Sequence, residues 1–290
     1  MAAVTPAALA LVLGAAVFHA LWNAAAKGAR GSSYVFVWLN SVGSAACCLP
    51  LALVQLGRAG WPWSWSLLVG PVVSGLLHIV YSLVLQTGYR RAELGVVYPV
   101  ARGVGPLLTM LVALLALGER PGLAGLVGAV VVLAGILVVA TGNQITHRDR
   151  LVRGLAYGIA TGVAIACYTL WDNHAVVTWG LEPLTYFTFT ITTQAILLTP
   201  GAVRRRAHWQ VTLQTSWPRS AVVAVFSPLA YVLVLIAMQT TPVSLVAPVR
   251  ESSIVIGSML AWWLYREPNP VRRLAGAVVV LLGIGLIAVG

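Results

Sequence analysis

The sequence predicts an all-α polytopic membrane protein in which ten transmembrane helices form two inverted repeats of five. Three observations support this fold class: a very apolar composition, long apolar segments separated by short polar turns, and an internal repeat. Of the 290 residues, 59% are hydrophobic and 9% are charged, whereas a soluble domain carries roughly 25% charged residues. This composition excludes a typical cytosolic enzyme, a disordered regulator and a disulfide-rich secreted domain, because one soluble core could not bury so much apolar surface.

Ten apolar segments follow one another along the chain, each close to the ~20 residues that a helix needs to cross a bilayer. They cover residues 6–26, 34–56, 67–88, 94–117, 123–141, 154–177, 183–200, 220–239, 243–264 and 271–289. Their apolar runs are continuous rather than alternating, which excludes transmembrane strands. The first segment has no basic stretch before it and nine segments follow it, so we expect no cleaved signal peptide.

The basic residues predict how these segments are oriented. Of the 18 Lys and Arg residues, 14 lie in loops after odd-numbered segments: Lys27, Arg30, Arg90, Arg91, Arg148, Arg150, Arg153, Arg204, Arg205, Arg206, Arg219, Arg266, Arg272 and Arg273. Only Arg58 and Arg120 lie in the other loops. The positive-inside rule therefore predicts cytoplasmic odd-numbered loops and extracytoplasmic termini. Because the basic residues are dispersed between apolar segments, the net charge of +11 does not indicate a nucleic-acid partner.

The two halves of the sequence resemble each other. Four blocks recur in order at an offset of 148 or 149: 128–136 at 276–284, Glu119 at Glu267, 20–23 at 169–172, and 98–100 at 247–249. A one-residue insertion between Pro99 and Glu119 explains the change of offset. We therefore divide the chain into five-helix repeats at residues 1–145 and 146–290.

The odd number of segments in each half has a consequence for the architecture. After five crossings the second half enters the membrane from the opposite side, so the repeats must be inverted. Inverted repeats are typical of secondary transporters, which bind their substrates near the bilayer midplane between the two halves.

Several motifs occur in both halves. Each half has an early Trp followed by a polar residue and a fourth segment that begins at an x-Pro-Val stretch. That segment ends at a Gly-Glu-Arg-Pro or Arg-Glu-Pro turn, and a Gly-rich fifth segment follows. Over nearly the whole chain these motifs resemble the EamA family of the drug/metabolite transporter superfamily. The resemblance implies a small-molecule carrier, often an exporter, whose cavity is lined by segments 1, 3, 4, 6, 8 and 9. It also implies cytoplasmic termini, whereas the Lys and Arg count predicts the reverse orientation, which we keep.

Three charged residues lie deep within predicted segments. Arg102 lies in the fourth segment, and Arg250 and Glu251 occupy a similar depth in the ninth. Charges at this depth cost several kcal/mol, on the order of ~3 by insertion scales, and usually mark a transport pathway or a buried pair. Two interpretations stay open: the arginines bind an anionic group of the substrate with Glu251 as counter-ion or proton site, or the three residues form a structural bridge.

Polar and aromatic residues recur at matching positions of the first and sixth segments. His19 and Asn23 share one helix face because they are four residues apart, and Tyr168 and Asp172 occupy the equivalent positions. These sets, with Trp22 and Trp171, are predicted to approach each other across the cavity, where indole rings could stack on a substrate. The alternatives are a helix–helix hydrogen bond for His19 and a place at the membrane interface for Trp171 and Asp172.

The third and fourth segments add three candidate binding residues. His78 and Tyr81 lie on one face of the third segment, and Tyr98 lies four residues before Arg102 on the fourth. Histidine titrates near physiological pH, so His19 or His78 could couple transport to protons. The carboxylate alternatives are Glu251, Asp172 and Glu93. The sequence does not decide among these five groups.

Glycine spacing predicts where helices pack closely. Glycines recur seven residues apart on the fifth and tenth segments, and a GxxxGxxxG face begins at Gly154 on the sixth. Small residues let helix backbones approach closely in lipid, so we assign these glycines to packing. The cysteines Cys47, Cys48 and Cys167 lie in apolar runs without metal-ligand spacing, so we expect neither a metal site nor a cofactor.

These features together predict a secondary-active exporter in the plasma or inner membrane. Its expected cargo is a small polar or anionic metabolite, an amino-acid-like compound or a drug, carried by alternating access. Protons are candidate coupling ions, and a homodimer is one candidate assembly in the lipid bilayer. The sequence has no catalytic motif such as HExxH or GxSxG, so we expect no enzyme. A flippase for a lipid or lipid-linked sugar on the same fold is the alternative.

Overall fold

The computed structural model describes residues 5–27, 29, 31–59, 64–92, 94–140, 148–256 and 270–289, and within these ranges it contains helices and no β-strand. The helices are α1 (Pro6–Lys27), α2 (Ser33–Ala59), α3 (Trp65–Arg91), α4 (Leu94–Leu115), α5 (Leu123–Ala140), α6 (Arg148–Asn173), α7 (Pro183–Arg204), α8 (Trp209–Met238), α9 (Val243–Arg250) and α11 (Pro270–Val289). A π-helical turn follows α6 and a 3-10 turn precedes α8. Among the described residues, five helical stretches are long and apolar enough to cross a membrane.

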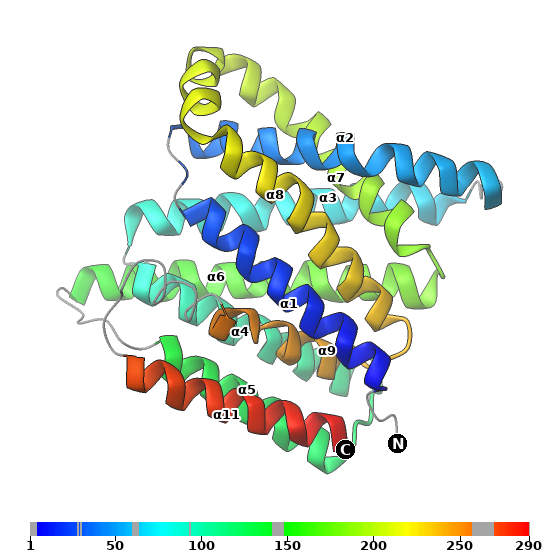
Figure 1. Ribbon diagram of the computed structural model, residues 1–290, viewed down its shortest axis with the longest axis vertical. Helices are drawn as coiled ribbons and strands as arrows, with labels where there is room; N and C mark the ends of the chain where they lie inside the picture. The colour runs from blue at the N-terminus through cyan, green and yellow to red at the C-terminus, as the bar shows by residue number, and fades with distance from the viewer. Residues whose placement is uncertain are drawn as a thin grey trace.

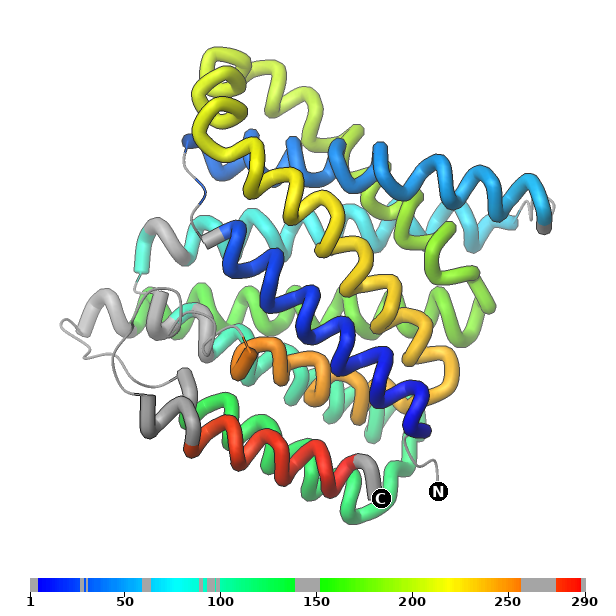
Figure 2. Tube along the Cα trace, in the orientation of Figure 1, coloured from blue at the N-terminus to red at the C-terminus, as the bar shows by residue number. Residues whose placement is uncertain are grey.

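Several helix contacts recur when the two halves are exchanged. Helix α1 packs against α8 as α6 packs against α3, and α2 packs against α8 as α7 packs against α3. Equivalent helices also pack against each other, as α2 does with α7, α4 with α9 and α5 with α11. Figure 1 and Figure 2 show α5 and α11 side by side at one edge of the molecule. The packing therefore agrees with the internal repeat in the sequence.

Glycine brings α5 and α11 into backbone contact. A Cβ atom at Gly128 would lie 2.6 Å from the carbonyl oxygen of Gly283, and one at Gly283 would lie 2.8 Å from that of Gly128. On α6, a Cβ atom at Gly158 or Gly162 would lie 2.7 Å from a valine of α4. The prediction that glycines on these segments serve close helix packing is confirmed at Gly128, Gly283, Gly158 and Gly162.

Basic residues at the ends of several helices lie on one side of the molecule. Helices α1, α3, α5 and α7 end on the side where α6 begins, at the left of Figure 1. Lys27, Arg91 and Arg204 are at these ends. Helix α1 begins and α11 ends on the opposite side, where the chain ends are marked N and C (Figure 1).

Two helices differ from their predicted segments. Helix α8 begins at Trp209 rather than at residue 220, because Trp209 stacks on Trp38 of α2 at 4.7 Å and so anchors a polar first turn. The predicted continuous ninth helix is wrong in its middle, since α9 ends at Arg250 in a turn before helix resumes at Ser253. At this turn the N–H groups of Glu251 and Ser252 donate to the carbonyl oxygens of Pro248 and Val249, three residues earlier, at 3.1 and 3.0 Å.

Some predictions concern residues that lie outside the described part of the chain. They are the candidate proton site Glu93, the loop residue Arg266, the repeat residue Glu267 and the remainder of the ninth segment, 257–264.

Candidate functional site

The charged residues predicted to lie deep in the bilayer come together. Nη1 of Arg102 donates a hydrogen bond to Oε2 of Glu251 at 2.8 Å, and Nη2 lies 3.0 Å from Nε2 of His19. Arg250 faces the other carboxylate oxygen, with Nε at 3.2 Å and Nη2 at 3.1 Å from Oε1. Arg102, Arg250 and Glu251 expose 4%, 2% and 0% of their surface. We call these four residues the arginine cluster, and they join α1 and α4 to the end of α9.

The helix that carries Arg250 is held in place by the other half of the chain. At the start of α9 the cap position is Pro242, which has no side-chain acceptor. The carboxylate of Glu119, from the turn between α4 and α5, instead accepts hydrogen bonds from the N–H groups of Val243 and Ser244 at 2.9 and 3.0 Å. These bonds satisfy donors that a helix start leaves unpaired. Glu119 therefore ties the two halves together at one end of α9.

Several buried polar atoms around the arginine cluster have no hydrogen-bond partner among the described residues. They include Nη1 of Arg250 and the hydroxyl groups of Ser252 and Ser253, directly after the end of α9. Nε1 of Trp22 is a further such donor, and its ring packs edge-on against His19 with 4.8 Å between centroids. A buried polar group without a partner costs ~1–3 kcal/mol. A guanidinium group with a spare N–H can bind a carboxylate or phosphate group.

A second buried cluster forms around Asp172. Its two carboxylate oxygens each accept a hydrogen bond from a tyrosine hydroxyl, Oδ1 from Tyr186 at 2.6 Å and Oδ2 from Tyr231 at 2.5 Å. Nε2 of His78 lies 3.8 Å from Oδ2, and Nδ1 lies 3.0 Å from the carbonyl oxygen of Ser74. Asp172 has no exposed surface. We call Asp172, Tyr186, Tyr231 and His78 the aspartate cluster, which joins α3 to α6, α7 and α8.

Aromatic rings pack around the aspartate cluster. His78 stacks on Tyr168 with 4.1 Å between ring centroids, and Tyr81 packs edge-on against Tyr168 at 5.4 Å. Phe187 packs against Tyr231 at 4.8 Å. The aromatic rings around the aspartate cluster are therefore in contact with one another.

The two clusters are electrostatic neighbours. The Arg250 charge acts on the hydroxyl groups of Tyr168 and Tyr231, and on His78. Within the described ranges, no group of three or more His, Cys, Asp or Glu is arranged to hold a metal ion.

The remaining predicted site residues have other partners. Asn23 donates to the carbonyl oxygen of His19 in its own helix at 2.7 Å. Trp171 donates to the carbonyl oxygen of Gly70 on α3 at 2.9 Å and packs against Trp179, so it does not share partners with Trp22. Tyr98 lies in α4, but its side chain lies outside the described part of the structure.

Sequence reasoning missed Tyr186 and Tyr231, the two donors to Asp172. Both lie in apolar segments, where tyrosine is typical of core packing. One signal could have pointed to them, because a buried carboxylate needs hydrogen-bond donors from neighbouring helices. Ser252 and Ser253 were also missed, although they follow Glu251 directly.

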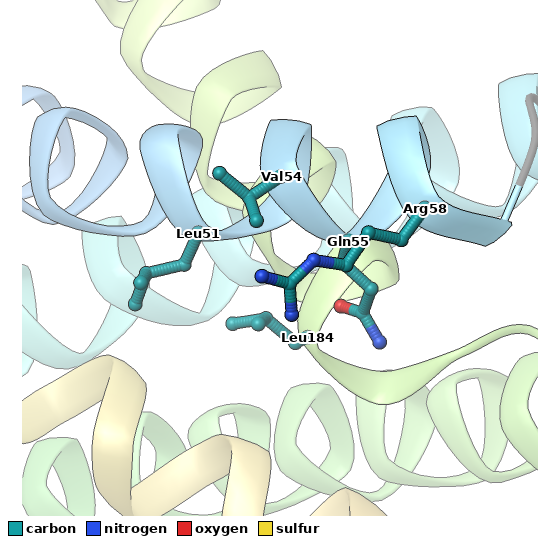
Figure 3. A pocket seen from close by; sticks show the side chains of 5 residues that line it. All are labelled: Leu51, Val54, Gln55, Arg58 and Leu184. Carbon is teal, nitrogen blue, oxygen red and sulfur yellow. The ribbon is translucent and has the colours of Figure 1, made fainter.

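A separate pocket lies at the periphery, between the end of α2 and the start of α7. Leu51, Val54 and Leu184 give it apolar walls, and Gln55 and Arg58 give it a polar edge. Figure 3 shows the guanidinium group of Arg58 beside Gln55, above Leu184. Apolar walls with one cation at the edge suit an amphipathic ligand.

Comparisons with known proteins agree with this architecture. The family model of the EamA-like transporter family matches the sequence twice, over residues 6–141 and 152–289. One crystal structure of a protein matches with a TM-score of 0.75 at 16% sequence identity, and the match covers 97% of this chain and 96% of that one. A match at this identity shows the fold alone. No similar sequence was found among the curated proteins.

Proposed function

The chain belongs to the EamA-like transporter family, and we propose that it is a secondary transporter for a small metabolite or drug with an anionic group. The proposal includes amino-acid-like compounds, which carry a carboxylate. Transport proceeds by alternating access between the two five-helix repeats, in the direction of export, with protons as the coupling ion.

The observation that carries this proposal is the buried guanidinium group of Arg250. Its Nη1 atom has no hydrogen-bond partner among the described residues, and the unpaired hydroxyl groups of Ser252 and Ser253 follow it in the chain. Glu251 faces two arginines, so the arginine cluster retains positive charge after internal pairing. A carboxylate or phosphate group would neutralise that charge and accept the spare hydrogen bond.

The arrangement of the helices supports an inverted repeat and alternating access. Helix α1 ends on the side where its equivalent, α6, begins, so the two run in opposite directions (Figure 1). The arginine cluster joins helices of both halves, and Arg102, Arg250 and Glu251 are all buried. A transporter that rocks its halves about such a site must open and reseal these contacts.

A flux assay tests the proposed cargo. Proteoliposomes are loaded in parallel with labelled organic acids, amino acids and phosphonates, and efflux is measured with and without a pH gradient. We expect flux of at least one of these anions, and its loss in the Arg250→Ala variant. Normal flux of every compound by both Arg102→Ala and Arg250→Ala would contradict the site.

A labelling assay tests the proposed orientation in the plasma or inner membrane. The basic side is expected to be cytoplasmic, with both termini outside. After Cys47, Cys48 and Cys167 are replaced, a single cysteine at Arg205 should resist an impermeant thiol reagent added to intact cells. Rapid labelling from outside would contradict this orientation.

The peripheral pocket favours a flippase as the second candidate function. Arg58 at its edge could hold a phosphate headgroup while Leu51, Val54 and Leu184 contact an acyl chain. A flippase would give headgroup-dependent lipid scrambling in the same proteoliposomes, without flux of water-soluble anions. That outcome would replace the metabolite carrier by the flippase.

A further inference from the structure

We propose that His78 and Asp172 form a proton-binding site between the two halves, and that the bound proton weakens the hydrogen bond from Tyr231 to Asp172. The site rests on the distances among His78, Asp172, Ser74 and Tyr231. Only its service as the coupling site of transport rests on the proposed function.

In the neutral ring of His78, one of the two nitrogens carries the hydrogen atom. Nδ1 lies 3.0 Å from the carbonyl oxygen of Ser74, one helical turn earlier. The Ser74 hydroxyl lies farther from Nδ1, at 3.3 Å, and can accept or donate, whereas the carbonyl oxygen only accepts, so we assign the hydrogen to Nδ1. In the neutral ring, Nε2 then carries the lone pair. Nε2 of His78 is therefore a hydrogen-bond acceptor, and it faces Asp172.

That neighbour is also an acceptor. Oδ2 of Asp172 lies 3.8 Å from Nε2 of His78, beyond hydrogen-bond distance. Neither atom has a hydrogen to offer the other, and the side chain of Asp172 is fully buried while that of His78 is 12% exposed. When Nε2 takes up a proton from water, it becomes an N–H donor that faces the carboxylate of Asp172. When the proton leaves to water on the other side, the present arrangement returns.

The bound proton changes the competition for Oδ2. In the structure this oxygen accepts from Tyr231 at 2.5 Å. Closing the 3.8 Å gap would move His78 and Asp172 together and bring a charged donor to the same oxygen as Tyr231. Both bonds end on the ionised carboxylate and are charge-assisted, but only the imidazolium also carries a positive charge that attracts Asp172. Tyr186 keeps its separate bond to Oδ1, so the change is confined to Tyr231.

The groups that face His78 link this site to the arginine cluster. Helix α6 contributes Asp172 and Tyr168, α7 contributes Phe187, α8 contributes Tyr231, and α9 contributes the charge of Arg250. Arg250 acts electrostatically on both Tyr231 and His78. A proton on His78 therefore changes the electrostatic potential at Arg250, the residue proposed to hold the substrate anion. By reciprocity, an anion at Arg250 also changes proton binding.

Nuclear magnetic resonance of the full chain in nanodiscs tests the proton site without a substrate. The chain has two aspartates, Asp149 and Asp172, and five histidines. Carboxyl-labelled aspartate, ring-labelled histidine and ring-labelled tyrosine report on the cluster while the pH falls from about 8 to about 5, the range in which histidine titrates. His78→Gln and Tyr231→Phe assign the two ring signals, and His19→Gln is the matched control.

We expect the signals of His78, Asp172 and Tyr231 to shift together in one step in the wild-type protein. The shift of Asp172 should be lost in His78→Gln and retained in His19→Gln. Separate titration of His78 and Asp172, or an Asp172 signal that does not respond to pH, would overturn the proposal. These outcomes are independent of the flux assay, in which failure of the proposed transport function appears as absence of anion flux.

Discussion

The arginine cluster and the aspartate cluster are both buried, yet they satisfy their charges in opposite ways. Both oxygens of Asp172 accept tyrosine hydroxyl groups, so its hydrogen bonding is complete within the protein. Arg250 keeps an unpaired Nη1 although it faces Glu251. The difference agrees with the two proposals, in which the arginine cluster offers donors to a ligand and the aspartate cluster holds a proton.

The largest effect is expected from removing the carboxylate of the arginine cluster. Glu251→Gln leaves two buried arginines without a counter-charge, and breaking a buried ion pair from one side costs ~3–5 kcal/mol. The free energy of unfolding in mixed detergent micelles measures the loss. The double variant with Arg102→Gln should recover part of the loss, because it leaves one buried charge rather than two. A loss below ~1 kcal/mol, typical of exposed pairs, would show that the cluster is hydrated.

A smaller effect is expected from the aspartate cluster. Tyr231→Phe or Tyr186→Phe removes one of the two donors to Asp172, and a hydrogen bond to a charged group contributes ~1.5–3 kcal/mol. Tyr157→Phe is the matched control, because Tyr157 accepts its hydrogen bond from Arg91 at an exposed site. The same unfolding measurement applies. If all three variants lose equal stability, Asp172 does not depend on its tyrosines.

The smallest effect is expected from removing the carboxylates that cap α9 and α7, the helices that carry Arg250 and Tyr186. Glu119 caps α9, which bears Arg250, whereas Glu182 caps its own helix, α7, which bears Tyr186. Each change to Ala should cost ~0.5–2 kcal/mol as the loss of a helix cap. Because Glu119 links the two halves, only Glu119→Ala should also alter anion flux. Equal flux changes in both variants would show that the Glu119 cap has no specific role in transport.

Much of the fold followed from local signals in the sequence. Apolar segment lengths located most helices, and the glycine spacing predicted close helix packing on the fifth, sixth and tenth segments, because lipid imposes the same requirements on every span. The break in α9 was not predicted, since the sequence around Arg250 is apolar enough to read as one continuous segment. At the turn the N–H groups of Glu251 and Ser252 donate to carbonyl oxygens three residues earlier, and the Glu251 carboxylate pairs with two arginines, which are contacts that depend on the folded chain.

The candidate site was predictable only in part. Arg102, Arg250 and Glu251 were identified because a charge in a membrane needs a partner, and the repeat related Arg102 to Arg250 or Glu251, depending on where the one-residue insertion falls. Tyr186 and Tyr231 were not identified, because their bonds to Asp172 depend on how α6, α7 and α8 pack. Likewise, the contact of Trp171 with Gly70 depends on the packing of α6 against α3.

The central claim is that Arg250 binds the anionic group of the substrate. Anion flux through proteoliposomes containing wild type, Arg250→Lys or Arg250→Gln tests it most directly, with Gly285→Ala as control because a Cβ there meets no atom within 4 Å. Arg102 still neutralises Glu251 in Arg250→Gln, so this variant should fold. We predict a loss of flux of ~10-fold or more in Arg250→Gln, as expected when a charge-assisted hydrogen bond is lost. The loss in Arg250→Lys should be smaller, and wild-type flux in Arg250→Gln would contradict the claim.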